Sequence, residues 1–178
     1  MSKKIIWIVV AVLLVLGAGY LYQTVPTEND IKMVNMLNNT GESMGTVALS
    51  STKAGVLLNL DLKGLTPGGD HAMHIHAVGD CSPLETFKNA GGHFNPHGKH
   101  HGMKHPEGQH AGDMPNLKPD SKGAIKVAFV NLHVTLDSGV AGLFDADGSA
   151  IVIHASADDH ISQPSGAAGP RIACGVIN

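Results

Sequence analysis

Nine of the twelve histidines of this 178-residue chain lie between Asp70 and Asp113. Two of them, His74 and His76, are separated by a single residue in an alternating stretch. In a β-strand, residues i and i+2 point to the same face, so these two imidazoles would be directed at one position. The remaining histidines and Asp113 offer more ligands than one metal ion can use. The pattern therefore predicts a site for two metal ions.

The candidate ligands divide into two sets. His154 ends the apolar run Ala150–His154, as expected for a side chain that leaves a buried strand at its rim. With His74 and His76 it would form a nitrogen-rich set with open coordination positions, which favours copper. The second set supplies three nitrogens and one oxygen, which suits a closed, structural zinc site: His93, His101, His110 and Asp113. His93 begins the loop that carries the other zinc ligands, and it could bind both metals through its two ring nitrogens.

The other histidines have no place in these sets. We predict that three of them are exposed and incidental, with capture of copper and zinc as the alternative: His97, His100 and His105. His71 lies three residues before His74, so we expect it to face away and to form structural hydrogen bonds. His133 and His160 are predicted to be ordinary polar positions.

Residues 1–22 differ in composition from the rest of the chain. Lys3 and Lys4 precede the stretch Ile5–Tyr22, about eighteen residues without a charge, a length between a signal-peptide core and a membrane-spanning helix. The lysines predict that the rest of the chain is exported. No clear Ala-x-Ala cleavage motif follows, so we expect an uncleaved membrane anchor, with a cleaved signal peptide as the alternative. Residues 23–30 are predicted to be a polar linker, and residues 31–178 the exported domain.

The chain has two cysteines, Cys81 and Cys174. Exported proteins form disulfides, so the even count predicts one disulfide, with two free thiols as the alternative. The net charge is −3, only 4% of residues are aromatic, and the only basic tract is Lys3-Lys4. These properties argue against a nucleic-acid partner.

Short strands must position these residues. Alternation of apolar and polar residues, with turn signals between the runs, predicts about eight strands: Ile31–Leu37, Gly45–Ser50, Val56–Leu62, His71–Val78, Ala124–Val130, His133–Leu136, Ala150–His154 and Arg171–Ile177. Residues 79–122 lack periodicity and hold five of the nine prolines, so we predict a long functional loop there. This pattern predicts an all-β antiparallel sandwich or barrel.

Several segments together resemble the copper/zinc superoxide dismutase family, and closely its bacterial exported members. They are His-Ala-Met-His-Ile-His at 71–76, Gly-His-Phe-Asn-Pro at 92–96, His-Gly at 101–102, His-Ala-Gly-Asp-Met-Pro-Asn at 110–116, Ile-His at 153–154 and Pro-Arg-Ile-Ala-Cys-Gly-Val-Ile at 170–177. The resemblance runs from about residue 31 to the end. It implies a Greek-key, eight-stranded antiparallel β-barrel that disproportionates superoxide to dioxygen and hydrogen peroxide by Cu(II)/Cu(I) cycling, with a structural zinc that shares a bridging histidine.

The resemblance also implies residue roles. Copper would be bound by His74, His76, His93 and His154, and zinc by His93, His101, His110 and Asp113. Arg171 would orient superoxide at the mouth of the copper channel, and His93 would act in catalysis as the bridge. Asp158 would link the two sites through hydrogen bonds to ligand imidazoles. The pair Cys81 and Cys174 would pin the long loop to the last strand.

The main alternative is a non-catalytic exported protein that stores or delivers copper and zinc. We favour catalysis because the chain keeps every ligand and Arg171. The segment from Asp158 to Arg171 contains no Lys or Glu, so electrostatic steering of superoxide would come from Lys88, Lys99 and Lys104. We expect a periplasmic or other extracytoplasmic location in a bacterium, membrane-anchored or secreted, as either a monomer or a homodimer.

Overall fold

The structure is a computed structural model that describes residues 31–83 and 86–178. The predicted N-terminal segment (1–22) and linker (23–30) lie outside the described residues. Within the described part of the chain, no helix has the length and apolar character needed to cross a membrane.

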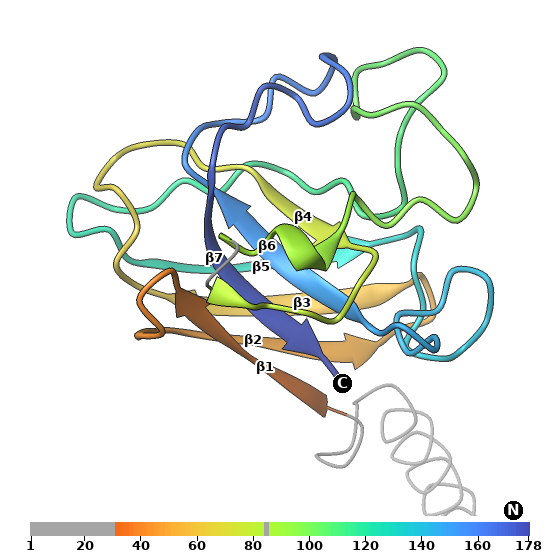
Figure 1. Cartoon of the computed structure of the whole chain (residues 1–178), viewed down its shortest axis with the longest axis horizontal. Coiled ribbons are helices and arrows are strands. Elements are labelled where there is room, and N and C mark those ends of the chain that lie inside the picture. The colour runs from red at the N-terminus through yellow and green to blue at the C-terminus, as the bar shows by residue number, and fades with distance from the viewer. Residues whose placement is uncertain (1–30, 84–85) are drawn as a thin grey trace, which may run out of the picture. The chain divides into compact units, whose positions relative to one another are not determined.

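The described residues form one antiparallel sheet of seven strands in the order β4-β6-β7-β1-β2-β3-β5 (Figure 1). The strands are β1 (Ile31–Asn38), β2 (Ser43–Ser51), β3 (Val56–Leu62), β4 (Met73–His76), β5 (Ile125–Asn131), β6 (Ser149–His154) and β7 (Arg171–Ile177), and a 3₁₀ helix, η3 (Lys88–Ala90), lies between β4 and β5. The predicted all-β antiparallel class is confirmed. The long loop predicted at 79–122 is present: its described residues, 79–83 and 86–122, contain η3 and isolated bridges but no strand.

Strand β3 shows why one half of the sheet has a solvent face. In Val-Leu-Leu-Asn-Leu-Asp-Leu, Leu58 and Leu60 are buried in the main core, whereas Asn59 and Asp61 are exposed. Successive side chains of a strand alternate between faces, so this sequence buries one face only. β3 pairs along its whole length with β2 and with β5, which holds this half in register.

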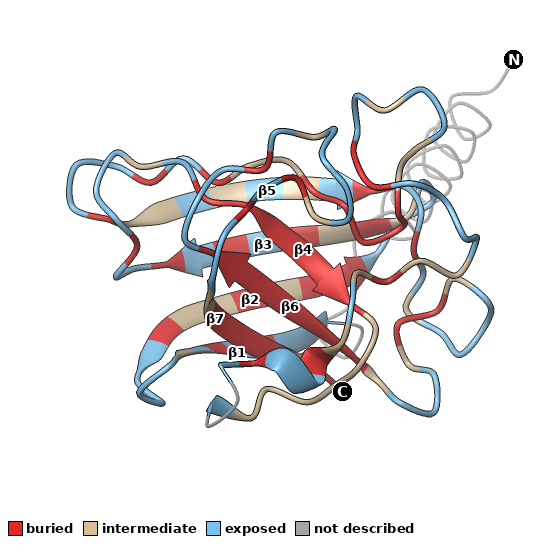
Figure 2. Cartoon of the chain, turned by 45° about the horizontal axis from the view of Figure 1, so that its top comes forward, coloured by how far each residue is buried: buried red, intermediate tan, exposed pale blue. Residues whose placement is uncertain are grey.

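At the other end of the sheet, β4 and β6 are buried on both faces, as their continuous red in Figure 2 shows. In Met-His-Ile-His of β4, the two apolar side chains join the main core, and His74 and His76 point to the opposite face. His74 pairs with Val152, which pairs with Cys174. These paired residues share that opposite face, which the long loops cover.

One predicted strand, His133–Leu136, is wrong. Only Thr135 forms a bridge there, with Gly142. The side chain of Asn131 ends β5: its Oδ1 accepts the His133 N–H at 2.8 Å, and its Nδ2 donates to Ala111 O at 2.8 Å. This capping turns the chain out of the sheet.

The position beside β4 is filled instead by a segment of the long loop. His74 forms an antiparallel bridge with Asp113, and His71 forms one with Leu117. Because His74 also pairs with β6, the bridged segment 113–117 must lie along the other edge of β4. The tertiary pairing thus carries Asp113 to the strand that holds His74 and His76.

Candidate metal centre

Four imidazoles converge outside the main core: His74, His76, His93 and His154 each place one ring nitrogen within 4.8 Å of the others. Each ring has one hydrogen-bonded nitrogen and one buried nitrogen without a partner among the described residues. The partnerless atoms are His74 Nδ1, His76 Nε2, His93 Nε2 and His154 Nε2.

Backbone carbonyls fix the tautomers of two of these rings. His76 donates Nδ1–H to Gly91 O at 2.9 Å, and His154 donates Nδ1–H to Gly169 O at 3.0 Å. The lone pair of each Nε2 is therefore left for a metal. A β-bulge in the pairing of β6 with β7 lies between Ile153 and His154. Bulges redirect side chains at strand ends, and this one occurs where His154 joins the cluster.

The rings are neutral and able to coordinate. Burial lowers the pKa of His74 to about 3, that of His76 to about 2 and that of His154 to about 4. Four buried nitrogens without partners would be costly, and one cation at their common position would satisfy them. The all-nitrogen donor set fits copper.

A second group surrounds Asp113. Its Oδ1 lies 2.9 Å from His93 Nδ1, 3.1 Å from His101 Nδ1 and 3.3 Å from His110 Nδ1. Ligand atoms on a tetrahedral zinc with bonds of about 2.0–2.1 Å would be about 3.3 Å apart. The spacing therefore fits one small tetrahedral ion. His93 reaches this group through Nδ1 and the first group through Nε2.

The second set of ligand atoms within 4.8 Å of one another comes from His74, His93, His101 and Asp113, and so contains His74 in place of the predicted His110. Nε2 of His74 is already hydrogen-bonded to Asp158 at 2.9 Å. His110 Nδ1, in contrast, lies 3.3 Å from His93 Nδ1 as well as from Asp113. His110 therefore also contacts the group around Asp113.

The electrostatics of the second group favour a cation. Burial opposes ionisation of Asp113, but hydrogen bonds from His101, His110 and His93 outweigh it and hold its pKa well below the usual range. Burial also opposes protonation of His101, but Asp113 and Asp158 outweigh it and raise the pKa of that ring to about 9. The two carboxylates that favour a proton on His101 would also favour a dication bound to this ring. The dication would displace the proton.

Asp158 connects the two groups. Its Oδ2 accepts from His74 Nε2 at 2.9 Å, and its Oδ1 accepts from His101 Nε2 at 3.0 Å. Burial opposes its ionisation, but these hydrogen bonds outweigh burial and hold its pKa well below the usual range. A Cβ on Gly166 would clash with Asp158 Oδ1, so only glycine leaves room for the carboxylate.

Two side-chain amides hold the loops that carry Asp158 and His101. The side chain of Asn116 donates to Asp158 O at 2.9 Å and accepts the Asp158 N–H at 2.8 Å. Gln163 donates to His101 O and accepts its N–H, both at 2.9 Å. Sequence reasoning assigned neither residue a role. Asn116 lies in a quoted motif, whereas no local signal marks Gln163.

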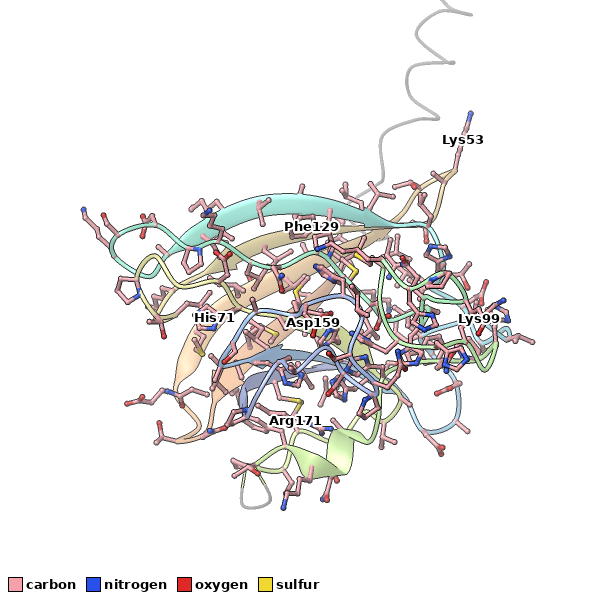
Figure 3. All side chains as sticks on the ribbon, turned by 90° about the horizontal axis from the view of Figure 1, so that it is seen from above. Lys53, His71, Lys99, Phe129, Asp159 and Arg171 are labelled. Atoms are coloured by element: carbon pink, nitrogen blue, oxygen red, sulfur yellow. A yellow bond between two sulfur atoms is a disulfide. The ribbon has the colours of Figure 1, made fainter. Side chains whose placement is uncertain are left out.

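Arg171 is half-buried and lies beside η3 (Figure 3). Its Nη1 donates to Phe87 O at 2.5 Å and its Nη2 to Gly91 O at 2.6 Å. Gly91 O also accepts from His76, so one carbonyl orients both the arginine and a ring of the first group. The guanidinium has further N–H donors, and its charge contributes to the lowered pKa of His76 and His154.

The predicted disulfide is confirmed: Cys81 is bonded to Cys174 of β7. It ties the segment that contains Phe87 and Gly91 to the sheet. Both carbonyls that hold Arg171 therefore belong to a segment with a covalent attachment to the strand of Arg171 itself.

The remaining histidines differ in their surroundings. His71 is buried, donates Nδ1–H to His154 O at 2.8 Å and accepts the Thr66 N–H at 3.2 Å, which confirms its predicted structural role. His160 was predicted to be ordinary, but its N–H donates to Asp158 Oδ1 at 2.6 Å and its Nδ1 lies 3.3 Å from Oδ2. His97, His100 and His133 are exposed, and His105 is half-buried.

The family model described as copper/zinc superoxide dismutase (SODC) matches residues 43–177. Among curated relatives, superoxide dismutase (Cu-Zn) 2 of Aquifex aeolicus is 46% identical over 177 residues, covering 98% of this chain and 99% of that protein. The superoxide dismutase (Cu-Zn) of Caulobacter vibrioides is 45% identical over 140 residues, covering 77% of this chain and 79% of the relative.

Solved structures agree with these relatives. A superoxide dismutase-like protein from Bacillus subtilis has a TM-score of 0.79 at 36% identity, covering 83% of this chain and 98% of that chain. The Cu/Zn superoxide dismutase from Brucella abortus has a TM-score of 0.66 at 28% identity, covering 83% of this chain and 99% of its own.

Proposed function

This chain belongs to the copper/zinc superoxide dismutase family, and from that membership we infer the role of each residue in its metal centre. It is a superoxide dismutase that converts superoxide to dioxygen and hydrogen peroxide, with copper and zinc as cofactors. The observation that carries the assignment of residues is the convergence of four buried imidazole nitrogens without partners.

His74, His76, His93 and His154 are the copper ligands, and His93, His101, His110 and Asp113 are the zinc ligands. When bound, copper supplies the one-electron redox chemistry of the reaction, and zinc, which has no accessible redox step, supplies fixed positive charge. His93 is the bridge, because its two nitrogens face different groups. Its Nε2 takes up a proton from solvent and gives it to the peroxide product in each turnover, while Nδ1, which lies beside Asp113, would be held by zinc.

Arg171 binds and orients superoxide. Two of its N–H groups are held by Phe87 O and Gly91 O, which fixes the direction of the others. Its charge is permanent and close to the copper ligands His76 and His154, so a small anion beside it would lie near the copper position.

Replacing Arg171 by Ala is expected to lower kcat/KM about 10- to 100-fold, because the attraction between two unit charges about 4 Å apart lies between about 1 kcal/mol in water and about 4 kcal/mol near a protein surface. Copper content should be unchanged, and Arg171→Lys should retain part of the rate because it keeps the charge. The measurement is dismutation per bound copper by pulse radiolysis. Lys53→Ala is the matched control, since Figure 3 shows Lys53 far from Arg171. A storage protein would be slow with and without Arg171.

Asp158 retains zinc by orienting His101. Asp158→Asn has the same size but cannot accept from both His74 and His101 as a carboxylate does, so zinc affinity should fall about 10- to 100-fold. Competition with a chelator of known affinity measures this change. The adjacent, exposed Asp159 gives the control variant Asp159→Asn. Equal zinc affinity in the two variants would remove the assigned role.

Residues 1–22 export the chain and remain as a membrane anchor, residues 23–30 are a linker, and residues 31–178 are the enzymatic domain. The disulfide supports an extracytoplasmic location, and the relatives of Aquifex and Caulobacter are bacterial. The location we propose is the periplasm. N-terminal sequencing of protein from the membrane fraction should find the original N-terminus. A soluble protein that starts after residue 22 would instead establish a cleaved signal peptide.

The fold is completed as an eight-stranded Greek-key barrel by the segment 113–117. Its bridges to β4 through Asp113 and Leu117 support this assignment. The domain could act as a monomer or a homodimer, since every ligand of the proposed site comes from one chain.

A further inference from the structure

Outside the two metal groups, two imidazoles and one carboxylate are neighbours on the long loop, although their ligand atoms do not all lie within 4.8 Å of one another. The rings of His100 and His105 have centroids 4.9 Å apart, and His100 Nε2 lies 3.4 Å from Glu107 Oε2. Within the copper group, the rings of His76 and His93 are 5.0 Å apart and those of His76 and His154 are 5.8 Å apart. The outer pair thus has almost the spacing of rings that share a metal ion.

The backbone of this loop is held in place, so the pair does not depend on side-chain rotamers alone. Asn95 donates to Lys99 O and accepts its N–H, both at 2.9 Å. His100 forms a parallel bridge with Gly108, and Gly108 N–H donates to His105 O at 3.1 Å. The bonds fix the positions from which both rings project.

The site is open and only partly formed. The side chains of His100 and Glu107 are 54% and 74% exposed, so water and ions reach them. His105 Nδ1 accepts the Glu107 N–H at 3.1 Å, and the ring must turn or exchange a proton to bind a metal. Lys99 and Lys104 add positive charge nearby. These features predict weak, rapidly exchanging binding.

We propose that His100, His105 and Glu107 form a third metal site that takes up Cu(II) or Zn(II) from solution. Two imidazoles and one carboxylate suit both ions, and Cu(II) should bind more tightly. His100 is followed directly in the chain by His101, whose buried ring lies in the zinc group. A metal held by His100 is thus one residue from an interior ligand, so the outer site would raise the metal concentration where the interior site is filled.

The test begins with the full chain loaded with copper and zinc at both interior sites. A titration with Cu(II), monitored by calorimetry and by electron paramagnetic resonance, should show that one further equivalent of Cu(II) binds and has its own spectrum. A mild chelator should remove that equivalent while interior copper and zinc stay bound. Because the interior sites are already filled, this result does not depend on the roles assigned to them.

The double variant H100Q/H105Q should weaken the additional binding at least about tenfold, and Glu107→Gln should weaken it less. His97→Gln and His133→Gln are controls that change exposed histidines outside the cluster and should bind as the unmodified protein does. Absence of an additional equivalent in the unmodified protein overturns the site, as does unchanged binding in the double variant. The proposed role of this site in metal loading is contradicted if the metal-free variant H100Q/H105Q takes up limiting zinc as fast as the unmodified protein does.

Discussion

Replacing His154 by Ala should remove copper and lower the dismutation rate by more than about 100-fold, while zinc remains bound. Even the loss of a residue that supports a metal ligand costs about 10- to 100-fold in metal affinity or activity, and His154 is assigned as a ligand itself. Its Nε2 is one of the four convergent nitrogens. It forms no part of the group around Asp113, so the zinc site should survive.

The matched variant is His110→Ala, which should lose zinc and keep copper. Metal content by mass spectrometry and rate per chain, measured on both variants, separate the two sites. His71→Gln is a further comparison, since His71 is buried beside His154 but has both ring nitrogens hydrogen-bonded. A His154→Ala protein with full copper and full rate would contradict the assignment. So would loss of zinc alone.

Removing the disulfide should lower the free energy of unfolding by about 4–5 kcal/mol. The sequence separation of Cys81 and Cys174 is 93 residues, and in the chain-entropy model a cross-link that closes a loop of this length restricts the unfolded chain by that amount. The variant C81A/C174A is preferred to serine, because Cys174 is fully buried in an apolar cluster and a hydroxyl there would lack a partner. Urea unfolding of metal-free protein measures the effect without the contribution of bound metal.

The same variant should also lower kcat/KM more than it lowers copper content. The carbonyls of Phe87 and Gly91 direct Arg171, and the disulfide attaches their segment to the strand of Arg171. Chemical reduction of the unmodified protein should produce the same change, which serves as the control for the substitutions. An unfolding free energy within about 1 kcal/mol of the disulfide-bonded form would contradict the stabilising role.

The strands could be predicted where the alternation of apolar and polar residues reports burial of one face. Val56–Leu62, whose buried residues alternate, has the predicted bounds, and so does Arg171–Ile177, although its residues 173–175 are buried without alternation. The pattern failed at His133–Leu136, because the side chain of Asn131 caps the end of β5 through contacts with Ala111 and His133. Such capping depends on a residue 20 positions away in sequence, which no local pattern reports.

Sequence by itself determined the chemistry of the donors, which are a His-x-His pair on a strand and a loop rich in histidine that contains Asp113. The two cysteines likewise predicted the disulfide. Residue type sets which metals can bind, and that property is local. Only the tertiary structure decided how the donors are arranged. It brings segment 113–117 to the edge of β4. It also lets Asp158 connect the two groups of ligands, and it places Asn116 and Gln163 where they hold the loops of Asp158 and His101. These contacts join residues far apart in a loop without periodicity, so hydrogen bonds and packing across the fold, and not any repeating pattern, specify them.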